Sequence, residues 1–222
     1  MITIGIPVYQ QSEFLAEAIE SALSQTANCE VICCNDGSKD NSLEIARRYP
    51  IKIINQTNRG LASARNSLIM KMTGNFFLPL DSDDILLPNA VEKIEETIKE
   101  NPNADIIGLS FKEFGISDRE VILAPSPTIE AFKLANFIGY CSAIRKSALL
   151  EVGGYNPKMV WGAEDYDLWF DLLKRGKKLI TIPEVLWMYR TKEKSMWTET
   201  AKHKEDFMNQ IKINHPEVWA IS

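Results

Sequence analysis

The chain has few of the residues that build zinc sites and disulfide frameworks. It contains two histidines, His203 and His215, and four cysteines among 222 residues. The histidines lie too far apart for a His-x-x-x-His zinc motif, and no two cysteines form a Cys-x-x-Cys pair. Cys33 and Cys34 are adjacent inside an apolar run, which favours buried, reduced thiols and a cytoplasmic protein.

The chain also lacks an excess of positive charge and a long apolar segment. Its 25 Lys and Arg against 30 Asp and Glu give a net charge of -5, which argues against a nucleic-acid partner. No apolar run reaches the length of a membrane span. Residues 1–6 have no basic flank and lead straight to Pro7, so they indicate a first strand and not a targeting segment. Peripheral membrane contact through Trp187, Trp197 and Trp219 is an alternative to roles in the core or in sugar contacts.

Glycine and basic residues are missing from the loop after the first expected strand, Val8-Tyr9-Gln10-Gln11-Ser12. A dinucleotide-binding dehydrogenase would carry Gly-x-Gly-x-x-Gly at this place. A sugar nucleotidyltransferase would carry a basic, glycine-rich loop to hold a triphosphate. The sequence disfavours both classes.

What the chain does contain is an alternation of strand and helix patterns in residues 1–103. Such alternation predicts an α/β fold with a mostly parallel sheet flanked by helices. Ser12 is the expected cap of the first helix, and Pro88 is expected in the first turn of the fourth. The strands are expected at 2–8, 31–34, 51–54 and 75–80, with a helix after each.

The pattern changes in residues 104–222, where we predict the second half of the same single domain. Residues 112–127 contain Gly115, Pro125 and Pro127 and indicate a polar connection without regular structure. Strands are expected at 104–111, 139–145 and 178–189, with helices at 146–152 and 164–175 and a charged C-terminal helix from 198.

The carboxyl ends of the first four expected strands carry Tyr9, Asp36, Asn58 and Asp81. Ligands of open α/β sheets bind beyond these ends. An aromatic ring, a carboxylate, an amide and an acidic cluster together suit a nucleotide with a metal. Each residue alone is more often a turn former, so the prediction depends on the combination.

The acidic cluster is Asp81-Ser82-Asp83-Asp84. Its three carboxylates repel one another in a cleft of low dielectric constant, and a divalent cation removes that cost. Hard oxygen ligands without nearby histidine or cysteine suit Mg²⁺ or Mn²⁺. Such a metal would stabilise a leaving diphosphate. The alternative is a solvated acidic turn in which Asp84 caps the helix near Pro88.

Glu164 and Asp165 open an expected helix between Trp161 and Trp169. A carboxylate at this place is a candidate general base for a sugar hydroxyl, and it is also a good partner for a helix N-terminus. The tryptophans could form a platform for a sugar or belong to the core.

With these motifs in hand, the chain resembles the family-2 glycosyltransferases of the GT-A fold over about residues 2–195. The matching segments follow the order of that family. They are Ile6-Pro7-Val8-Tyr9, Asn35-Asp36-Gly37-Ser38, Asn58-Arg59-Gly60, Ala64-Arg65-Asn66, Leu80-Asp81-Ser82-Asp83-Asp84 and Glu164-Asp165.

The resemblance implies an inverting, metal-dependent transferase that uses a nucleotide diphosphate sugar, with a UDP-sugar favoured. Residues 1–103 would bind this donor, and residues 104–222 would bind the acceptor, a glycan or a lipid-linked sugar. The alternative is a non-catalytic nucleotide-sugar or glycan-binding module of the same fold.

The resemblance also implies a role for individual residues. Tyr9 would flank the base, Asp36 would hydrogen-bond it with Arg65 close by, and Asp165, beside Glu164, would take the acceptor proton. Asp83 would bind Mn²⁺ or Mg²⁺ directly, while Asp81 would contact the ribose or reach the metal through water. Donor contacts are further implied for Pro7, Asn58, Gly60 and Ser82.

Two positions depart from the family pattern. Gln10 replaces a usual Asn, and Lys192 follows the pair Tyr189-Arg190 where relatives often carry a His. A protonated lysine cannot ligate a metal, but it can neutralise phosphate as a point charge. We therefore expect Lys192 or Lys194 to cover the leaving diphosphate, and the third metal ligand is left open.

Overall fold

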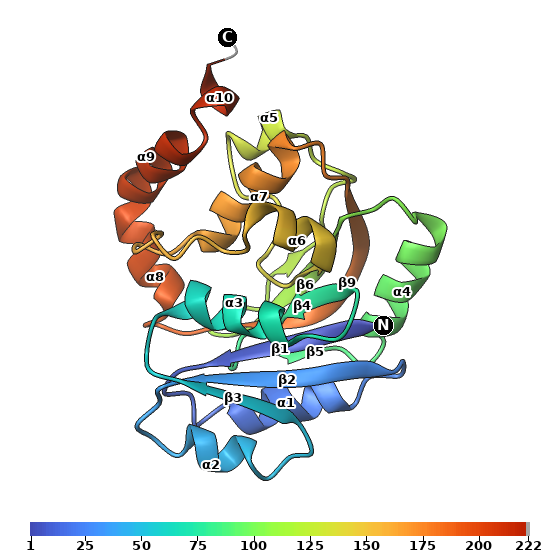
Figure 1. The fold of residues 1–222 in the computed structure, drawn as a ribbon, viewed down its shortest axis with the longest axis vertical. Coiled ribbons are helices and arrows are strands. Elements are labelled where there is room, and N and C mark those ends of the chain that lie inside the picture. The colour runs from blue at the N-terminus through green and yellow to red at the C-terminus, as the bar shows by residue number, and fades with distance from the viewer. Residues whose placement is uncertain (221–222) are drawn as a thin grey trace.

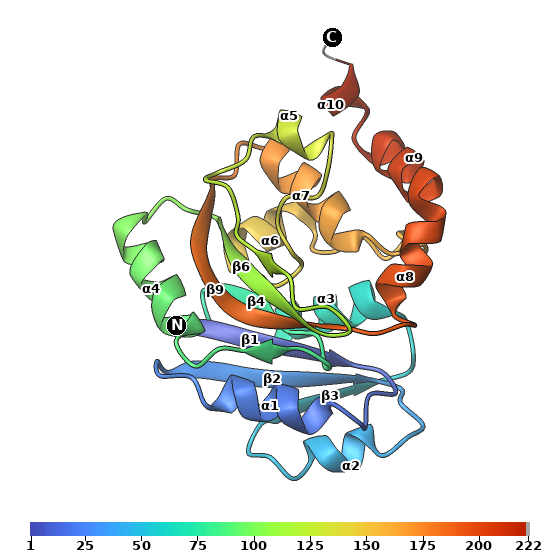
Figure 2. The same cartoon turned by 180° about the vertical axis from the view of Figure 1, so that it is seen from behind.

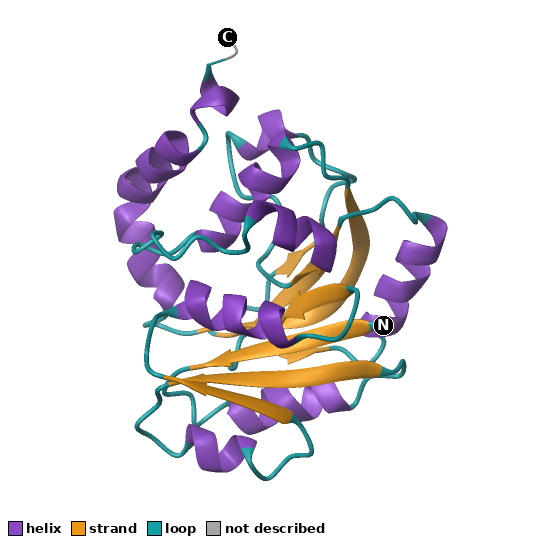
Figure 3. Ribbon diagram, in the orientation of Figure 1, coloured by secondary structure: helices purple, strands orange, loops and turns teal. Residues whose placement is uncertain are grey.

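The structure is a computed structural model that describes residues 1–220. Within them, nine strands form one mixed sheet with helices on both faces (Figure 1, Figure 3). The sheet order is β3-β2-β1-β4-β8-β6-β9-β5, and β7 pairs with β6. The strands are β1 (Ile2–Val8), β2 (Cys29–Asp36), β3 (Lys52–Gln56), β4 (Phe76–Pro79), β5 (Ile85–Leu86), β6 (Ile106–Gly115), β7 (Glu120–Val121), β8 (Ser142–Arg145) and β9 (Leu179–Thr191).

The helices follow the strands in the first half and cluster in the second. They are α1 (Leu15–Leu23), α2 (Ser42–Ala46), α3 (Leu61–Lys71), α4 (Ala90–Glu100), α5 (Ile129–Phe132), α6 (Lys146–Val152), α7 (Glu164–Lys174), α8 (Met196–Thr200), the 3₁₀ helix η1 (Ala201–His203), α9 (Lys204–Asn214) and α10 (Pro216–Trp219). The expected helical tail is thus a series of short helices.

Strands β3, β2, β1 and β4 are parallel, as the alternating sequence pattern predicted. Helices α1 and α2 cover one face of this part of the sheet and α3 covers the other (Figure 1). Every residue of β1 is buried, which explains why Thr3 is its only polar residue. Gly5 has no side chain because a Cβ there would lie 2.3 Å from the Phe77 ring.

The second half extends the sheet with antiparallel and parallel pairs. Strand β8 is antiparallel to both β4 and β6, whereas β6 runs parallel to the long strand β9 (Figure 2). The expectation of an irregular connection at 112–127 is wrong at its start, because β6 continues to Gly115 and pairs with β7. The extension pairs with β9 from Lys112, opposite Met188, to Gly115, opposite Thr191. The Phe111 ring packs 4.7 Å from the Trp187 ring at its start.

Two expected helix starts are also wrong. Helix α1 begins at Leu15 without a side-chain cap, and the Ser12 N–H instead donates to the Asp40 carboxylate at 3.0 Å. Helix α4 begins at Ala90, so Pro88 precedes its first turn. In both cases contacts with distant segments outweigh the local capping pattern.

The tryptophans considered for a membrane edge lie mostly inside. Trp187 is 1% exposed within the main core, and Trp219 packs partly buried against the core on the other face of the sheet. The alternative of membrane contact is therefore wrong for Trp187, while the Trp197 side chain lies outside the described part of the structure. Among residues 1–220, no helix has the length and apolarity needed to cross a membrane.

Candidate active site

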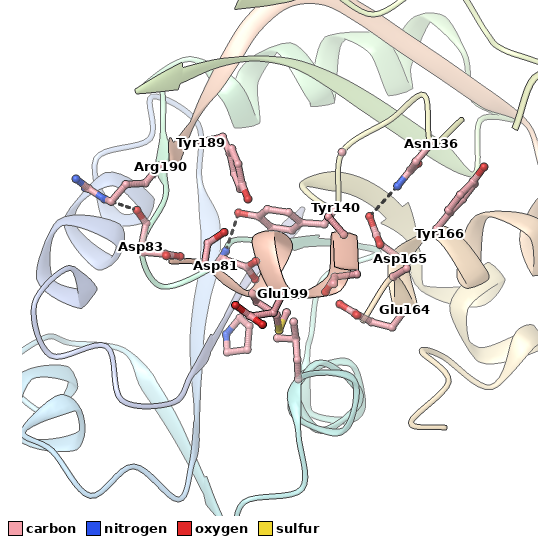
Figure 4. Close-up of a pocket in the computed structure, with 18 of the residues that line it drawn as sticks. Asp81, Asp83, Asn136, Tyr140, Glu164, Asp165, Tyr166, Tyr189, Arg190 and Glu199 are labelled. Atoms are coloured by element: carbon pink, nitrogen blue, oxygen red, sulfur yellow. Dashed lines mark hydrogen bonds between the residues drawn. The ribbon is translucent and has the colours of Figure 1, made fainter. Parts of the chain in front are cut away.

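One large cavity of about 1500 Å³ opens at the carboxyl ends of the parallel strands. Both halves of the chain line it. Figure 4 shows carboxylates from both halves, and tyrosines from the second half, converging on it. Every candidate site residue that the sequence indicated lies in its wall. These are Pro7, Tyr9, Asp36, Asn58, Gly60, Arg65, Asp81, Ser82, Asp83, Glu164, Asp165 and Lys192.

The wall formed by β1 and β2 combines an exposed aromatic ring with a fixed loop. The Tyr9 side chain is 45% exposed. The buried Asp36 carboxylate accepts the N–H groups of Arg59 at 2.9 Å and of Gly60 at 2.8 Å. Asp36 therefore fixes the loop that carries Asn58, in addition to facing the cavity.

A glycine is required beside this carboxylate. Gly37 has a φ of +74°, and a Cβ there would lie 2.7 Å from the backbone nitrogen of Asn58. Both the left-handed conformation and the lack of space explain why glycine follows Asp36.

Arg65 is a buried cation between the two halves. Its guanidinium donates to Asp81 at 2.8 Å and to Glu164 at 2.5 Å, while the side chain is 1% exposed. Burial acts to lower the pKa of Arg65, but Asp81 and Glu164 raise it well above its usual value. Arg65 thus ties the acidic turn after β4 to the start of α7.

The acidic turn has a buried anchor that the sequence did not reveal. Asp84 is 1% exposed and accepts hydrogen bonds from the Tyr140 hydroxyl and from the Arg190 N–H. The Tyr140 hydroxyl also accepts the Asp81 N–H at 3.0 Å. The alternative of a solvated turn in which Asp84 caps α4 is therefore wrong, because Asp84 is held by side chains and strands of the second half.

Asp81 and Asp83 remain as candidate metal ligands. Asp81 Oδ1 pairs with Arg65, and Asp83 Oδ2 accepts from Lys192 Nζ at 2.5 Å, so one oxygen of each carboxylate has no hydrogen-bond partner among the described residues. Burial and the nearby Asp83 raise the pKa of Asp81 to about 6, although Arg65 opposes the shift. Two hard carboxylate oxygens fit Mg²⁺ or Mn²⁺. Within residues 1–220, no group of three His, Cys, Asp or Glu side chains could hold such an ion alone.

Asp165 lies at the start of α7 and faces the cavity (Figure 4). Its carboxylate accepts a hydrogen bond from the Asn136 amide at 3.1 Å. Burial and the negative charge of Glu164 raise the pKa of Asp165 to about 6. A carboxylate with a raised pKa is a stronger general base near neutral pH. Glu164 is already paired with Arg65 and is the less available of the two.

Comparison with known proteins identifies the chain. Its residues 3–153 match the model of the family described as Glycosyl transferase family 2. The chain belongs to glycosyltransferase family 2. A relative at 32% identity over 202 residues is EpsE of Bacillus subtilis (strain 168), a protein named for glycosyltransferase activity; the match covers 85% of this chain and 72% of EpsE.

Solved structures show that this member of family 2 has the GT-A fold, which confirms the predicted fold. S. aureus TarS in complex with UDP-GlcNAc superposes with a TM-score of 0.80 at 17% identity, over 96% of this chain and 66% of the TarS chain. The mannosyltransferase PcManGT from Pyrobaculum calidifontis, in complex with GDP-Man and Mn²⁺, gives a TM-score of 0.72 at 16% identity, over 94% of this chain and 63% of that one. The chain thus spans about two thirds of these structures.

Membership of family 2 excludes the dehydrogenase and the nucleotidyltransferase. The structure adds residues that sequence reasoning missed, chiefly Tyr140, Asn136 and the anchoring role of Arg190. Asn136 lies in a segment without a recognisable pattern, and Tyr140 lies in an expected strand that gave no sign of its contact with Asp84, whereas Arg190 was visible as part of the Tyr189-Arg190 pair.

Proposed function

We propose that the chain is an inverting, metal-dependent glycosyltransferase that transfers a sugar from a UDP-sugar to a hydroxyl of a glycan or lipid-linked acceptor. The observation that carries this proposal is the convergence of the acidic turn and Asp165 on one cavity, with Arg65 between them. The UDP-GlcNAc complex of TarS and the GDP-Man and Mn²⁺ complex of PcManGT support a nucleotide-sugar donor and a metal.

The donor would bind against the wall of the first half. Tyr9 would flank the base. Asp36 would accept a hydrogen bond from it through the Oδ2 lone pair that the contacts with Gln56, Arg59 and Gly60 leave free. Pro7, Asn58, Gly60 and Ser82 would complete this wall. Asp83 and Asp81 would hold Mn²⁺ or Mg²⁺, which would supply positive charge to the leaving diphosphate.

Lys192 would add a second positive charge at the diphosphate. Its ammonium lies in the cavity wall, 4.7 Å from the centroid of the Phe14 ring. A lysine neutralises phosphate as a point charge, so this residue compensates for the His that relatives often carry. Lys192→Ala should weaken donor binding and slow turnover, and unchanged values of both would remove this role.

Asp165 would act as general base in a single displacement. It would take the proton of the acceptor hydroxyl as that oxygen attacks the anomeric carbon and the diphosphate leaves. One in-line displacement inverts the anomeric centre. Glu164 would position Asp165 by holding the start of α7 to Arg65. The four free cysteines, three of them buried, support a cytoplasmic location as part of the proposal.

The test is UDP release from a panel of nucleotide sugars, with and without Mn²⁺. Wild type should release UDP slowly from one sugar in a metal-dependent reaction, and both Asp83→Asn and Asp165→Asn should abolish it. Asp118→Asn is the matched control, because Asp118 is exposed and lies outside the cavity wall. Tight binding of a nucleotide sugar without release in any condition would replace the enzyme by a binding module of the same fold.

A further inference from the structure

Lys192 occupies the place where a cation would meet Asp83. The lysine ammonium lies 2.5 Å from Asp83 Oδ2, and the two side chains are 27% and 20% exposed. Asp83 is the carboxylate that the proposed function assigns to the metal. A metal ion bound there would therefore stand next to a like charge, which is unfavourable in a partly buried site.

The neighbouring Arg190 is fixed, in contrast to Lys192. Its guanidinium donates to the Asp83 carbonyl at 2.8 Å, and it stacks between the rings of Phe14 and Phe114 at 4.4 and 4.3 Å. Its backbone N–H binds Asp84 at 2.7 Å. These contacts hold the end of β9 against the acidic turn whatever the lysine does.

Lys192 is held far less firmly. Among the described residues, its ammonium makes one ion pair, with Asp83, besides its contact with the Phe14 ring. A lysine head group sits on a flexible four-carbon stem, so it can change partner within the cavity by side-chain rotation while Arg190 keeps the backbone in place.

We propose that Lys192 is an exchangeable counter-ion that couples the binding of metal and nucleotide. Lys192 neutralises Asp83 in the empty site and moves to the diphosphate of the donor when a metal binds to Asp83. When Lys192 pairs with the diphosphate, its charge no longer lies beside the metal. When the metal binds Asp83, Lys192 loses its partner there and can pair with the diphosphate. Each ligand then favours the other by the same factor, because coupling between two binding sites is reciprocal. This proposal depends on the proposed function.

Binding of Mn²⁺ measures the exchange without any catalytic turnover. The signal of free Mn²⁺ in electron paramagnetic resonance is titrated with the protein alone and with the protein saturated with UDP. Lys192→Met removes the charge and keeps an unbranched side chain of similar length. Lys158→Met is the matched control, because Lys158 is exposed and lies outside the cavity wall.

Without UDP, Lys192→Met should bind Mn²⁺ about tenfold more tightly than wild type, within the range of roughly 5- to 150-fold that is typical of coupled sites. The factor by which UDP improves Mn²⁺ binding should fall by a similar amount, and UDP affinity in the presence of Mn²⁺ should fall as well. Lys158→Met should match wild type in all three values.

Two results would overturn the exchange while the proposed function stands. One is Mn²⁺ affinity without UDP that is unchanged in Lys192→Met. The other is tighter Mn²⁺ binding with an unchanged UDP effect, which would show that Lys192 repels the metal without moving to the diphosphate. If wild type binds neither UDP nor Mn²⁺, the proposed function fails and this inference fails with it.

Discussion

Replacing Arg65 with methionine should destabilise the fold strongly, because one buried cation neutralises two carboxylates. The Arg65 side chain is 1% exposed, and its partners Glu164 and Asp81 are 7% and 25% exposed. Removing one partner of a buried ion pair costs about 3–5 kcal/mol, since the other is left buried without compensation. For a chain of this length, this loss lowers the melting temperature by roughly 10 °C.

The dependence on pH gives the prediction a second test. The folded-state pKa of Asp81 is about 6, above its ordinary value of 3.8, so protonation of Asp81 favours the folded state. Arg65 opposes this shift, so in its absence the folded-state pKa of Asp81 rises further and protonation of Asp81 favours the folded variant more than it favours folded wild type. The stability deficit of Arg65→Met should therefore shrink as the pH falls from about 7 to about 5.

Urea unfolding followed by tryptophan fluorescence measures both effects. Arg175→Met is the matched control: Arg175 is 43% exposed and pairs with Asp171 on the same helix, so its loss should cost less than about 1 kcal/mol. The double variant Arg65→Met with Glu164→Gln should regain part of the deficit. A deficit below about 1 kcal/mol for Arg65→Met, or a second loss from Glu164→Gln on top of the first, would refute the reasoning.

Three further predictions concern the cavity. Turnover should rise with pH through an apparent pKa near 6, because Asp165 must lose its proton to act as base; UDP release should fall to about a tenth one pH unit below that value, and a flat profile would argue against this base. Tyr140→Phe should lower the free energy of unfolding by about 1–3 kcal/mol, because the buried Asp84 loses its hydroxyl donor, and it should weaken Mn²⁺ binding at the acidic turn. If the urea unfolding curve and the Mn²⁺ binding curve both match those of wild type, the turn does not depend on that hydroxyl. Gly37→Ala should cost about 1–3 kcal/mol of unfolding free energy and reduce UDP affinity in calorimetry, whereas Gly153→Ala, also at positive φ but with open space around it, should leave UDP affinity unchanged.

Local sequence patterns were sufficient for most of the first half of the fold. Strand β1 matches the expected range 2–8, and helix α3 follows the third strand as expected, because apolar periodicity and glycine or proline breaks are local signals. The rule that ligands bind beyond the carboxyl ends of parallel strands also predicted that Tyr9, Asp36 and Asp81 lie together, and all three line one cavity.

The contacts that complete the site could not be predicted, because they join segments far apart in the sequence. Tyr140 reaches Asp84 across 56 residues, and Arg190 reaches the Asp83 carbonyl across 107. No local pattern encodes such a register. The extension of β6 beyond Phe111 has the same cause, since its pairing partner β9 begins only at Leu179.

The position of β9 in the chain also sets the order in which a newly made chain can acquire its site. This strand lies between β6 and β5 in the sheet, although it is the last strand to leave the ribosome among those described. Asp83 is made 109 residues before Lys192, an interval of roughly 5–20 s at typical rates of translation. During this time the acidic turn has neither of the contacts that Arg190 and Lys192 later provide. The acidic turn is therefore held in place only when the final strand docks, and a nascent chain stalled before it carries the motifs of the site without the contacts that fix Asp83 and Asp84.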